Sequence, residues 1–489
     1  MAAPFARLLP EVSMPGLIAT VRGVFDSVPD ARRQGSVKHS MSDTLASALA
    51  MFSLKYPSLL KFDEDVRRAE SDLVATNLKS LYGLSSVPSD SQMREILDPV
   101  DPAALAPAFR KIISGLQSFG AMRQMQVLEG RLLVAIDGTG SYASTNVSCE
   151  HCLHKKVSTA KKKKGARHGD TLSVSAQYEG GDGYESEREA EACAKTLLYH
   201  HQLVAAVAVH PEREKPSLPM AVEPIVGRDG TDKNDCEHVA VGRLLERLGA
   251  QYPKQRLLLV QDGLGANGPH IRRVLEHDMD FLVVARQDGN ASLFEAMRAR
   301  PEREMESWSV AADKEAGVLE HGYRIARDVP LNKSHDDLLV NVLEYWEIDK
   351  KGKQHIWVWV TNLVPTRENA EAMMRAGRAR WHIENSTFLT LKRQGYNFLH
   401  CYGHGKEHLQ SVLGTLMVLA LLIDQVQIGF CRVFQSILVK RKRFSYLVEK
   451  MRSIFDLVAV DSWAQFLSYL HTPGLIHAPD PRPLWESRC

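Results

Sequence analysis

The residues of this chain that are best suited to chemistry are three carboxylates, Asp137, Asp262 and Glu384. Asp137 and Asp262 each follow a short apolar run and precede a glycine, so each is expected where a buried strand ends. Glu384 lies in a predicted helix, one turn after Arg380, so these two side chains share a helix face. Carboxylate oxygens suit Mg²⁺ or Mn²⁺, and two such ions can support an in-line displacement at phosphorus. The three acids together predict phosphodiester cleavage and strand transfer.

Each of these residues also has an explanation that involves no chemistry. Asp-Gly is a favoured turn pair, so Asp137 or Asp262 alone would be explained as a turn former. An arginine and a glutamate four residues apart, such as Arg380 and Glu384, commonly form an ion pair on a solvated helix face. The combination of two strand-end acids with a helical acid favours the metal site, because only a fold could bring these distant residues together.

The surrounding elements predict an α/β fold, with a mixed sheet covered on both faces. After the first acid, apolar strand-like runs follow one another as in a meander, and from about residue 232 such runs alternate with amphipathic, helix-like segments. Strands are expected at 131–136, 201–209, 218–226, 256–260 and 281–285, and helices at 232–248 and 268–277.

The flanking regions predict helices and a β-rich insertion. Residues 338–346 and 355–361 are expected to form a β-hairpin with its turn at Lys351-Gly352. A helix at 89–97 has two interpretations, a DNA contact or a packed helix. The predicted division of the chain is an N-terminal helical domain at 1–125, a first sheet segment at 126–285, a β-rich insertion at 286–364, a second sheet segment at 365–425, and C-terminal helices with an irregular tail at 426–489.

Three motifs resemble those of DDE transposases of the insertion-sequence-four type. They are Leu-Val-Ala-Ile-Asp137, Leu-Val-Gln-Asp262 and Arg380-Trp-His-Ile-Glu384, the last followed by Lys392. The resemblance implies a ribonuclease-H-like catalytic fold with a β-strand insertion between the second and third acids. It also implies cut-and-paste transposition of double-stranded DNA, acting on terminal inverted repeats and target DNA, with a homodimer in the synaptic complex. The three acids would hold Mg²⁺ or Mn²⁺, in all two ions, while Arg380 and Lys392 would hold DNA near the cut.

Two departures from the motif place the basic residues in question. The family carries a tyrosine three residues before the arginine, where this chain has Gly377. The family lysine follows the glutamate by seven residues, whereas Lys392 follows Glu384 by 392 − 384 = 8 residues. These differences suggest a divergent subgroup. Two alternative functions stay open: a non-catalytic DNA-binding protein derived from such an enzyme, against which the presence of all three acids argues, and a nuclease of the same fold that does not join strands.

Cysteines, a lysine run and tryptophans provide further candidate sites. Cys149 and Cys152 have zinc-like spacing, with Cys193 as a further partner, and the alternative is a pair of reduced thiols in a loop. The basic stretch 155–167 predicts either a solvated loop or a loop that contacts phosphate. His404, Lys406 and His408 are candidate phosphate contacts or surface residues. The tryptophans that could stack on a flipped base are Trp308, Trp346, Trp357 and Trp359.

The composition favours a cellular compartment but does not identify a ligand. The chain has 489 residues, and 61 basic against 59 acidic residues leave a net charge of +2, which neither requires nor excludes nucleic acid. Seven cysteines over this length favour reduced thiols and a cytoplasmic location, which the resemblance makes bacterial and associated with the nucleoid on DNA. The most apolar segment, 412–423, is about half the length needed to cross a bilayer, so no membrane span is expected.

Overall fold

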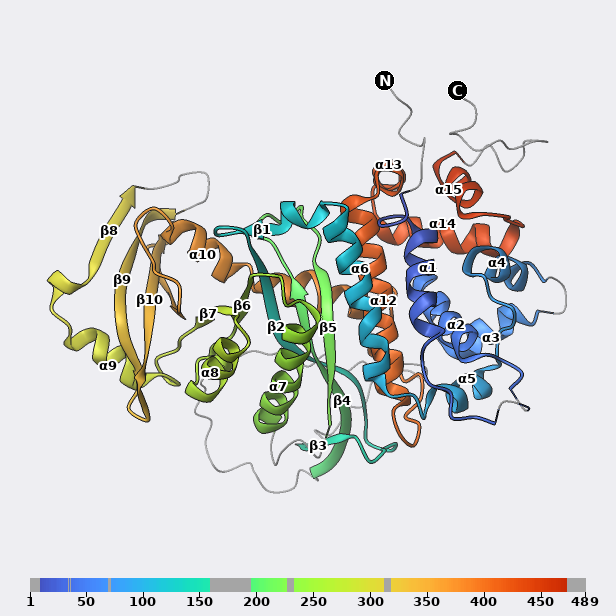
Figure 1. Ribbon diagram of the computed structural model, residues 1–489, viewed down its shortest axis with the longest axis horizontal. Coiled ribbons are helices and arrows are strands. Elements are labelled where there is room, and N and C mark those ends of the chain that lie inside the picture. The colour runs from blue at the N-terminus through green and yellow to red at the C-terminus, as the bar shows by residue number, and fades with distance from the viewer. Residues whose placement is uncertain are drawn as a thin grey trace, which may run out of the picture.

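The protein is elongated in the computed structural model (Figure 1). Helices from the N-terminal and C-terminal regions lie at one end, and a β-sheet extends to the other end. The structure describes residues 9–33, 35, 37–68, 72–158, 195–226, 233–311 and 318–472. The lysines at 161–164, Cys193 and the tail from 473 onwards lie outside these ranges, so the predictions made for them remain predictions.

Within the described residues, one sheet of eleven strands runs through the molecule. Nine strands follow each other in the order β3-β4-β2-β6-β7-β11-β10-β9-β8, and β1 and β5 pair with β2 and β4 outside that path. The bounds are β1 Gln126–Val127, β2 Arg131–Ser144, β3 Leu153–Ser158, β4 Lys195–Ala208, β5 Leu218–Ile225, β6 Leu257–Gln261, β7 Asp280–Val284, β8 Glu306–Ala311, β9 Val318–Asn332, β10 His335–Asp349 and β11 Gln354–Thr361.

The centre of the sheet is parallel and its flanks are antiparallel. Strands β2, β6 and β7 run in the same direction, while β4 is antiparallel to β2 and β11 is antiparallel to β7. The three parallel strands are rich in leucine and valine, as expected for strands that are buried on both faces. The prediction of a mixed α/β sheet is confirmed.

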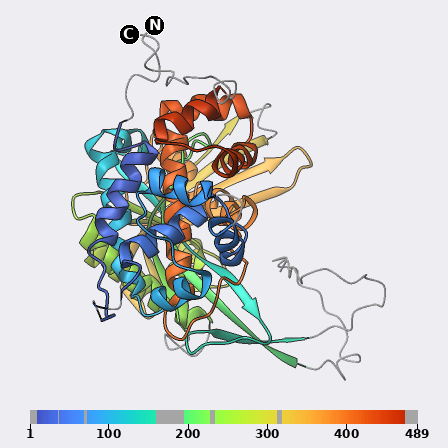
Figure 2. The same ribbon diagram turned by 90° about the vertical axis from the view of Figure 1, so that its right-hand side faces the viewer.

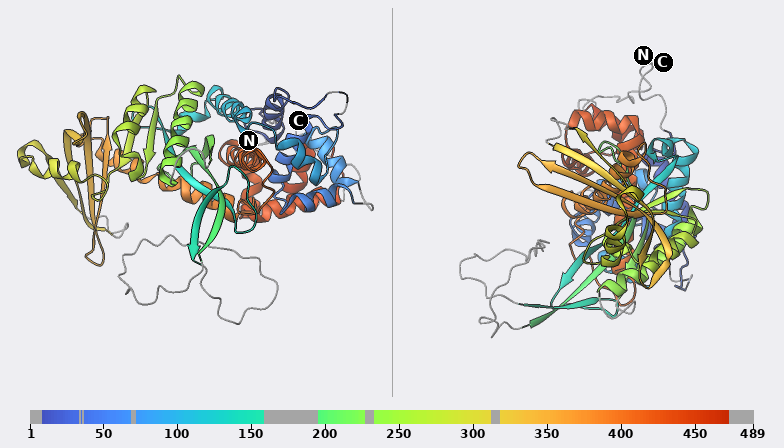
Figure 3. Two further views of the ribbon diagram at one scale, coloured as in Figure 1. Left: turned by 90° about the horizontal axis from the view of Figure 1, so that it is seen from below. Right: turned by 90° about the vertical axis from the view of Figure 1, so that its left-hand side faces the viewer.

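Helices cover both faces of these parallel strands (Figure 3). One face carries α7 (Lys233–Gln251) and α8 (Gly268–Glu276), which matches the helices predicted at 232–248 and 268–277. The other face carries α10 (Ala370–Arg378), a π-helical turn at Ile383–Phe388 and α11 (Leu389–Arg393). The chain therefore returns to the parallel strands after the β9–β11 excursion, and it brings Glu384 with it.

The β-rich segment is a continuation of the central sheet. The predicted hairpin is present as β10 and β11, in which Trp346 pairs with Ile356. β11 also pairs with β7, with Thr361 opposite Leu282. The remaining strands of this end, together with α9 (Ala291–Ala299), extend the sheet away from the helices (Figure 1).

The N-terminal and C-terminal helices pack into one helical body (Figure 2). A capping box between Ser89 and Gln92 begins α5, and Ser40 caps α2 by accepting a hydrogen bond from the Asp43 N–H. α12 lies against α2 and α6 from the N-terminal region and also against the sheet. The helices are α1 Met14–Phe25, α2 Met41–Ser53, α3 Leu59–Val66, α4 Leu73–Tyr82, α5 Asp90–Leu97, α6 Ala106–Ser118, α12 Leu409–Phe430, α13 Arg432–Arg441, α14 Phe444–Leu457 and α15 Trp463–His471.

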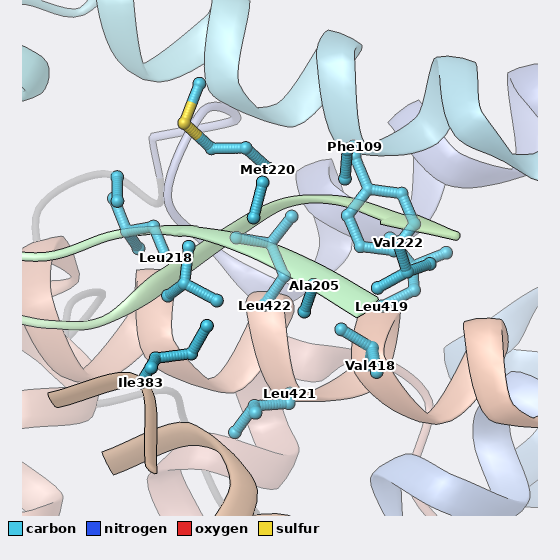
Figure 4. Packing of buried hydrophobic residues seen from close by; sticks show 14 of the residues in the cluster. Phe109, Ala205, Leu218, Met220, Val222, Ile383, Val418, Leu419, Leu421 and Leu422 are labelled. Atoms are coloured by element: carbon cyan, nitrogen blue, oxygen red, sulfur yellow. The ribbon is translucent and has the colours of Figure 1, made fainter. Parts of the chain in front are cut away.

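The central helix α12 is longer than the apolar segment that predicted it. Its 22 residues are long and apolar enough to cross a membrane by length and composition, but 83% of the most apolar window is buried inside the protein. Figure 4 shows Leu419 and Leu422 of α12 on one side of β5, and Phe109 of α6 on the other. This burial explains the apolar composition of α12 as that of a core helix.

One strand prediction was wrong in a way that matters for the site. The strand predicted to end at Ile136 continues to Ser144, and Asp137 pairs within it opposite Ala205 of β4. Asp137 is therefore held by strand pairing on β2 and does not form a turn. Asp262 does follow its strand directly, as predicted.

Candidate active site

The parallel register places Asp137 and Asp262 at the same level of the sheet. Ala135 of β2 pairs with Val260 of β6, and each aspartate lies two residues further along its strand direction. The Asp262 carboxylate accepts a hydrogen bond of 3.1 Å from the Leu264 N–H and so caps a short 3₁₀ turn. Both aspartates line one small pocket. The two side chains predicted to act together are thus brought together.

Arg380 connects the third acid to the first. Its Nη1 lies 2.9 Å from Glu384 Oε1 and 3.3 Å from Asp137 Oδ2, and the arginine is only 8% exposed. The ion pair predicted between Arg380 and Glu384 exists, but it does not lie on a solvated helix face. One buried guanidinium instead bridges two carboxylates that come from a strand and a helix.

The environment of Asp137 opposes its negative charge. Burial raises the pKa of Asp137 to about 7, and the neighbouring charges of Glu384 and Asp262 act in the same direction. Arg380 opposes this rise without cancelling it. A carboxyl group in this condition is stabilised as an anion when a further cation binds beside it.

A π-helical turn accounts for the position of Lys392. Residues Ile383–Phe388 form this turn, directly between α10 and α11. A π-helical turn takes one residue more than an α-helical turn, so an offset of eight residues across it corresponds to the offset of seven in a regular helix. Lys392 is affected by both Asp137 and Glu384, which raise its pKa while the larger effect of burial lowers it. Lys392 therefore lies within electrostatic range of both acids.

The missing tyrosine also has a steric reason. A Cβ atom at Gly377 would lie 2.5 Å from Nε1 of Trp359, so no larger side chain fits at this position. Trp359 comes from β11 and is 1% exposed, and its indole nitrogen has no hydrogen-bond partner among the described residues. The space beside α10 is therefore filled by an aromatic ring from the neighbouring strand.

A basic cleft of about 1370 Å³ opens from Asp262 towards the β8–β11 strands. Its wall includes Arg380, Trp381 and the end of β7. Among the described residues, neither Arg286 nor Arg298 of this wall forms a salt bridge, so both guanidinium groups can bind an anion. The arginines of the cleft are Arg286, Arg298, Arg300, Arg324, Arg378 and Arg380.

Three residues of the site had not been predicted. Glu237 of α7 lines the pocket of Asp137 and Asp262 and would approach a Cβ atom at Gly138. Arg286 follows β7, the third parallel strand, and its side chain lies against Gly263. The position of Arg286 could have been found from the sequence, because the residue after each parallel strand reaches the same sheet edge.

Trp381 is the third unpredicted residue. It is 55% exposed and lines the cleft, with the Arg380 guanidinium 5.3 Å from its ring centroid. Of the tryptophans that the sequence offers for stacking on a flipped base, Trp359 is buried, and Trp308, Trp346 and Trp357 are partly buried. The guanidinium carbon of Arg378 lies 4.7 Å from the centroid of the Trp357 ring. Trp381 is accordingly an exposed ring in the cleft wall next to Arg380, where a base could stack.

The acidic residues have the ligand chemistry of a divalent-metal site. Asp137, Asp262 and Glu384 offer hard oxygen donors, and the charge on Asp137 is not balanced by Arg380 alone. A divalent cation such as Mg²⁺ or Mn²⁺ satisfies both conditions. The donor set therefore fits the predicted metal.

Cys149 and Cys152, and the loop that carries His404, Lys406 and His408, lie outside the site of the three acids. Cys149 and Cys152 come together with His201 and His404, and all four lie in one compact group. His404 is 8% exposed, so of its two interpretations, a phosphate contact or a surface residue, the surface one does not hold. The backbone N–H groups of Lys406 and His408 donate to the Asp98 carboxylate, which explains this part of the loop by its contact with α5.

Comparison with known proteins identifies a protein family whose match includes the site. A protein family described as Transposase DDE domain matches residues 130–423, which is more than half of the chain and contains all three acids. A solved structure of piggyBac transposase in a synaptic complex with hairpin DNA is similar at 10% identity, with a TM-score of 0.38, over 96% of this chain and 81% of that chain. No curated protein matches this chain at a significant level.

Proposed function

This chain belongs to the transposases with a DDE domain, and we propose that it cuts DNA at transposon ends and joins those ends to target DNA. The observation that carries the proposal is the convergence of Asp137, Asp262 and Glu384 beside one buried arginine. These acids would hold Mg²⁺ or Mn²⁺, in all two ions. Ions held by these three acids would supply activation of an attacking water or 3′-hydroxyl and stabilisation of the leaving oxygen at phosphorus.

The chain's own residues supply positioning and charge. Arg380 fixes the carboxylates of Asp137 and Glu384 relative to each other by its two salt bridges. Lys392 adds a positive charge next to the same acids, where it would bind the phosphate at the cut. The cleft arginines Arg286 and Arg298 would contact the DNA backbone beyond this phosphate.

The topology supports a ribonuclease-H-like catalytic core. Numbered along the chain, strands β2, β4, β5, β6 and β7 lie in the spatial order β5-β4-β2-β6-β7. The first, fourth and fifth of them are parallel, and the second is antiparallel to its neighbours. This is the order expected of that fold, and it places the first two acids on adjacent parallel strands.

The same arguments favour the insertion-sequence-four type. The segment between the second and third acids is rich in β-strands, as that type predicts. The π-helical turn restores the position of Lys392, and the Trp359 ring occupies the space next to Gly377. We extend the proposal to a cut-and-paste reaction by a homodimer on paired double-stranded ends, because two ends require two such sites.

One incubation separates this function from its alternatives. The full chain is mixed with Mg²⁺, a labelled DNA carrying the terminal repeat from the flanking genomic sequence, and a target plasmid. Joined products support the transposase. Cut ends without joining would instead identify a nuclease, and binding without cuts would identify a non-catalytic DNA-binding protein. A matched reaction with Ca²⁺ in place of Mg²⁺ controls for binding that leads to no chemistry.

A further inference from the structure

Four soft or borderline metal ligands converge at a second place in the fold, away from the three acids. They are Cys149 and Cys152 in the connection from β2 to β3, His201 on β4, and His404 in the loop before α12. One ligand atom from each lies within 4.8 Å of every other. Three of these residues are buried and Cys149 is partly exposed. We propose that this group is a structural zinc site.

The separations fit a tetrahedral zinc ion. Zn–S bonds of about 2.3 Å and Zn–N bonds of about 2.0–2.1 Å at tetrahedral angles place neighbouring ligand atoms about 3.3–3.8 Å apart. The Cys149 and Cys152 sulfurs are 3.6 Å apart, and His201 Nε2 lies 3.4 Å and 3.3 Å from them. The Cys152 sulfur lies 3.5 Å from His404 Nδ1. A sulfur separation of 3.6 Å excludes a disulfide between these two cysteines, whose bond would be about 2.05 Å.

Local backbone structure holds the ligands in place without a metal. The Cys149 N–H donates to the Cys152 sulfur at 3.3 Å, and the Cys152 N–H donates to the Cys149 carbonyl at 3.2 Å, so the two cysteines share one tight turn. His201 lies on β4 between His200 and Gln202, which both pair with β2, and its carbonyl accepts a hydrogen bond of 3.3 Å from the Ser141 hydroxyl. His404 stands between Gly403 and Gly405, whose positive φ angles of 135° and 68° allow the loop to turn around it.

The site closes a connection between three parts of the fold. The loop that carries His404 is also bound to the N-terminal helices, because the Asp98 carboxylate accepts hydrogen bonds from the N–H groups of Glu407 and Leu409 at 3.0 Å and 3.1 Å. The zinc ligands join this loop to the base of the β3–β4 arm, which projects from the body of the protein (Figure 3). Lys155 and Lys156 are exposed on the arm.

Four protein ligands leave no open coordination position, which is the arrangement of structural zinc sites and not of catalytic ones. Two cysteines and two histidines also select zinc over Mg²⁺, which prefers oxygen ligands. The zinc ion would therefore fix the basic arm relative to the helical body, and it would be chemically independent of the ions held by the three acids.

Metal analysis of the purified full chain tests the proposal. The protein is made in zinc-supplemented medium, desalted without chelator, and measured by inductively coupled plasma mass spectrometry. About one zinc per chain is expected in the wild type. Cys149→Ser and Cys152→Ser should lose it, whereas Cys431→Ser, which changes a cysteine outside the group, should retain it. Wild-type protein without zinc, or a Cys149→Ser/Cys152→Ser variant that retains it, would overturn the proposal.

A second measurement covers variants that do not fold. Wild-type protein is stripped of metal and titrated with Co²⁺, whose visible spectrum reports tetrahedral thiolate coordination. One Co²⁺ per chain with sulfur charge-transfer bands is expected, and zinc should displace it. A spectrum without thiolate coordination would contradict the site. Both readouts need no DNA, so failure of the zinc site and failure of the proposed transposase reaction are distinguishable, and Asp262→Asn should keep its zinc.

Discussion

Arg380 and Asp137 are 243 residues apart in the sequence, yet their side chains form a salt bridge of 3.3 Å inside the protein. The contact joins the central strand β2 to the helix that returns to the sheet after β11. It also explains why Glu384 has a defined position, because the same guanidinium nitrogen lies 2.9 Å from its carboxylate. The contact thus fixes the third acid relative to the first.

The raised pKa of Asp137 predicts a pH-dependent stability difference. Because the folded-state pKa is about 7 and the ordinary value is 3.8, the wild type loses stability as pH rises through this window. The Asn side chain of the Asp137→Asn variant cannot ionise, so the variant should not lose this stability as the pH rises. In buffer depleted of divalent cations, the variant should match the wild type near pH 4 and exceed it above pH 7 by a few kcal/mol. Urea unfolding across this pH range measures the difference.

Mg²⁺ provides the control for that prediction. Ions that bind the ionised acids stabilise the folded wild type, so saturating Mg²⁺ should narrow or reverse the difference at pH 8. If the difference in unfolding free energy between the two proteins were the same at every pH, with and without Mg²⁺, the pKa of Asp137 would not be raised by its surroundings.

Lys392 is predicted to act at the cut and not only in packing. Lys392→Met should lower the rate of strand cleavage by a factor on the order of 10² to 10³, the range found when a group that stabilises transition-state charge is removed. Arg393→Met is the matched control, since Arg393 is the next basic residue and is exposed. Single-turnover cleavage of labelled ends measures both. Equal rates in the two variants would separate Lys392 from the chemistry.

Gly377 is predicted to be fixed by the ring of Trp359. Gly377→Ala places a methyl group 2.5 Å from the indole nitrogen, so the free energy of unfolding should fall by about 1–3 kcal/mol. Gly414→Ala in α12 is the control, because its nearest neighbour outside the local chain is 3.7 Å away. Alanine favours a helix there by up to about 1 kcal/mol over glycine. Equal effects of the two substitutions on urea unfolding would contradict the steric account.

A buried ion pair should hold the N-terminal helices on α12. Lys55 Nζ lies 2.6 Å from Asp424 Oδ2, and the two side chains are 1% and 7% exposed. Asp424→Asn leaves the lysine charge buried without its partner, so unfolding should become easier by about 3–5 kcal/mol. Asp337→Asn removes the exposed partner of Arg272 and should cost at most about 1 kcal/mol. Similar losses in both variants would show that burial does not govern the Lys55 pair.

The sequence predicted which three acids come together, but it did not predict which contacts hold them in place. Leucine-rich runs before Asp137 and Asp262 fixed two strands, because buried parallel strands have this composition. Strand pairing extends β2 beyond Asp137, which local Asp-Gly propensity could not indicate. The contacts of Glu237, Arg286 and Trp359 depend on tertiary packing between segments far apart in the sequence.

Both irregular positions of the third motif, Gly377 and Lys392, are explained by structure that the spacing of residues does not show. The offset of Lys392 and the glycine at 377 looked like departures from the motif when spacing was judged against a regular helix. A π-helical turn and a ring from β11 compensate for them. The zinc-like group was predicted only in its Cys149–Cys152 half, since His201 and His404 reach it through the fold.

Asp137, Asp262 and Glu384 are proposed to form one metal-dependent site for DNA strand cleavage. The most direct test is strand cleavage by Asp137→Ala, Asp262→Ala and Glu384→Ala proteins with Mg²⁺, alongside DNA binding and circular dichroism of the same samples. Each variant should remain folded and bind transposon-end DNA while its cleavage falls to background. Cleavage at the wild-type rate in any one of the three would remove that residue from the site and contradict the account.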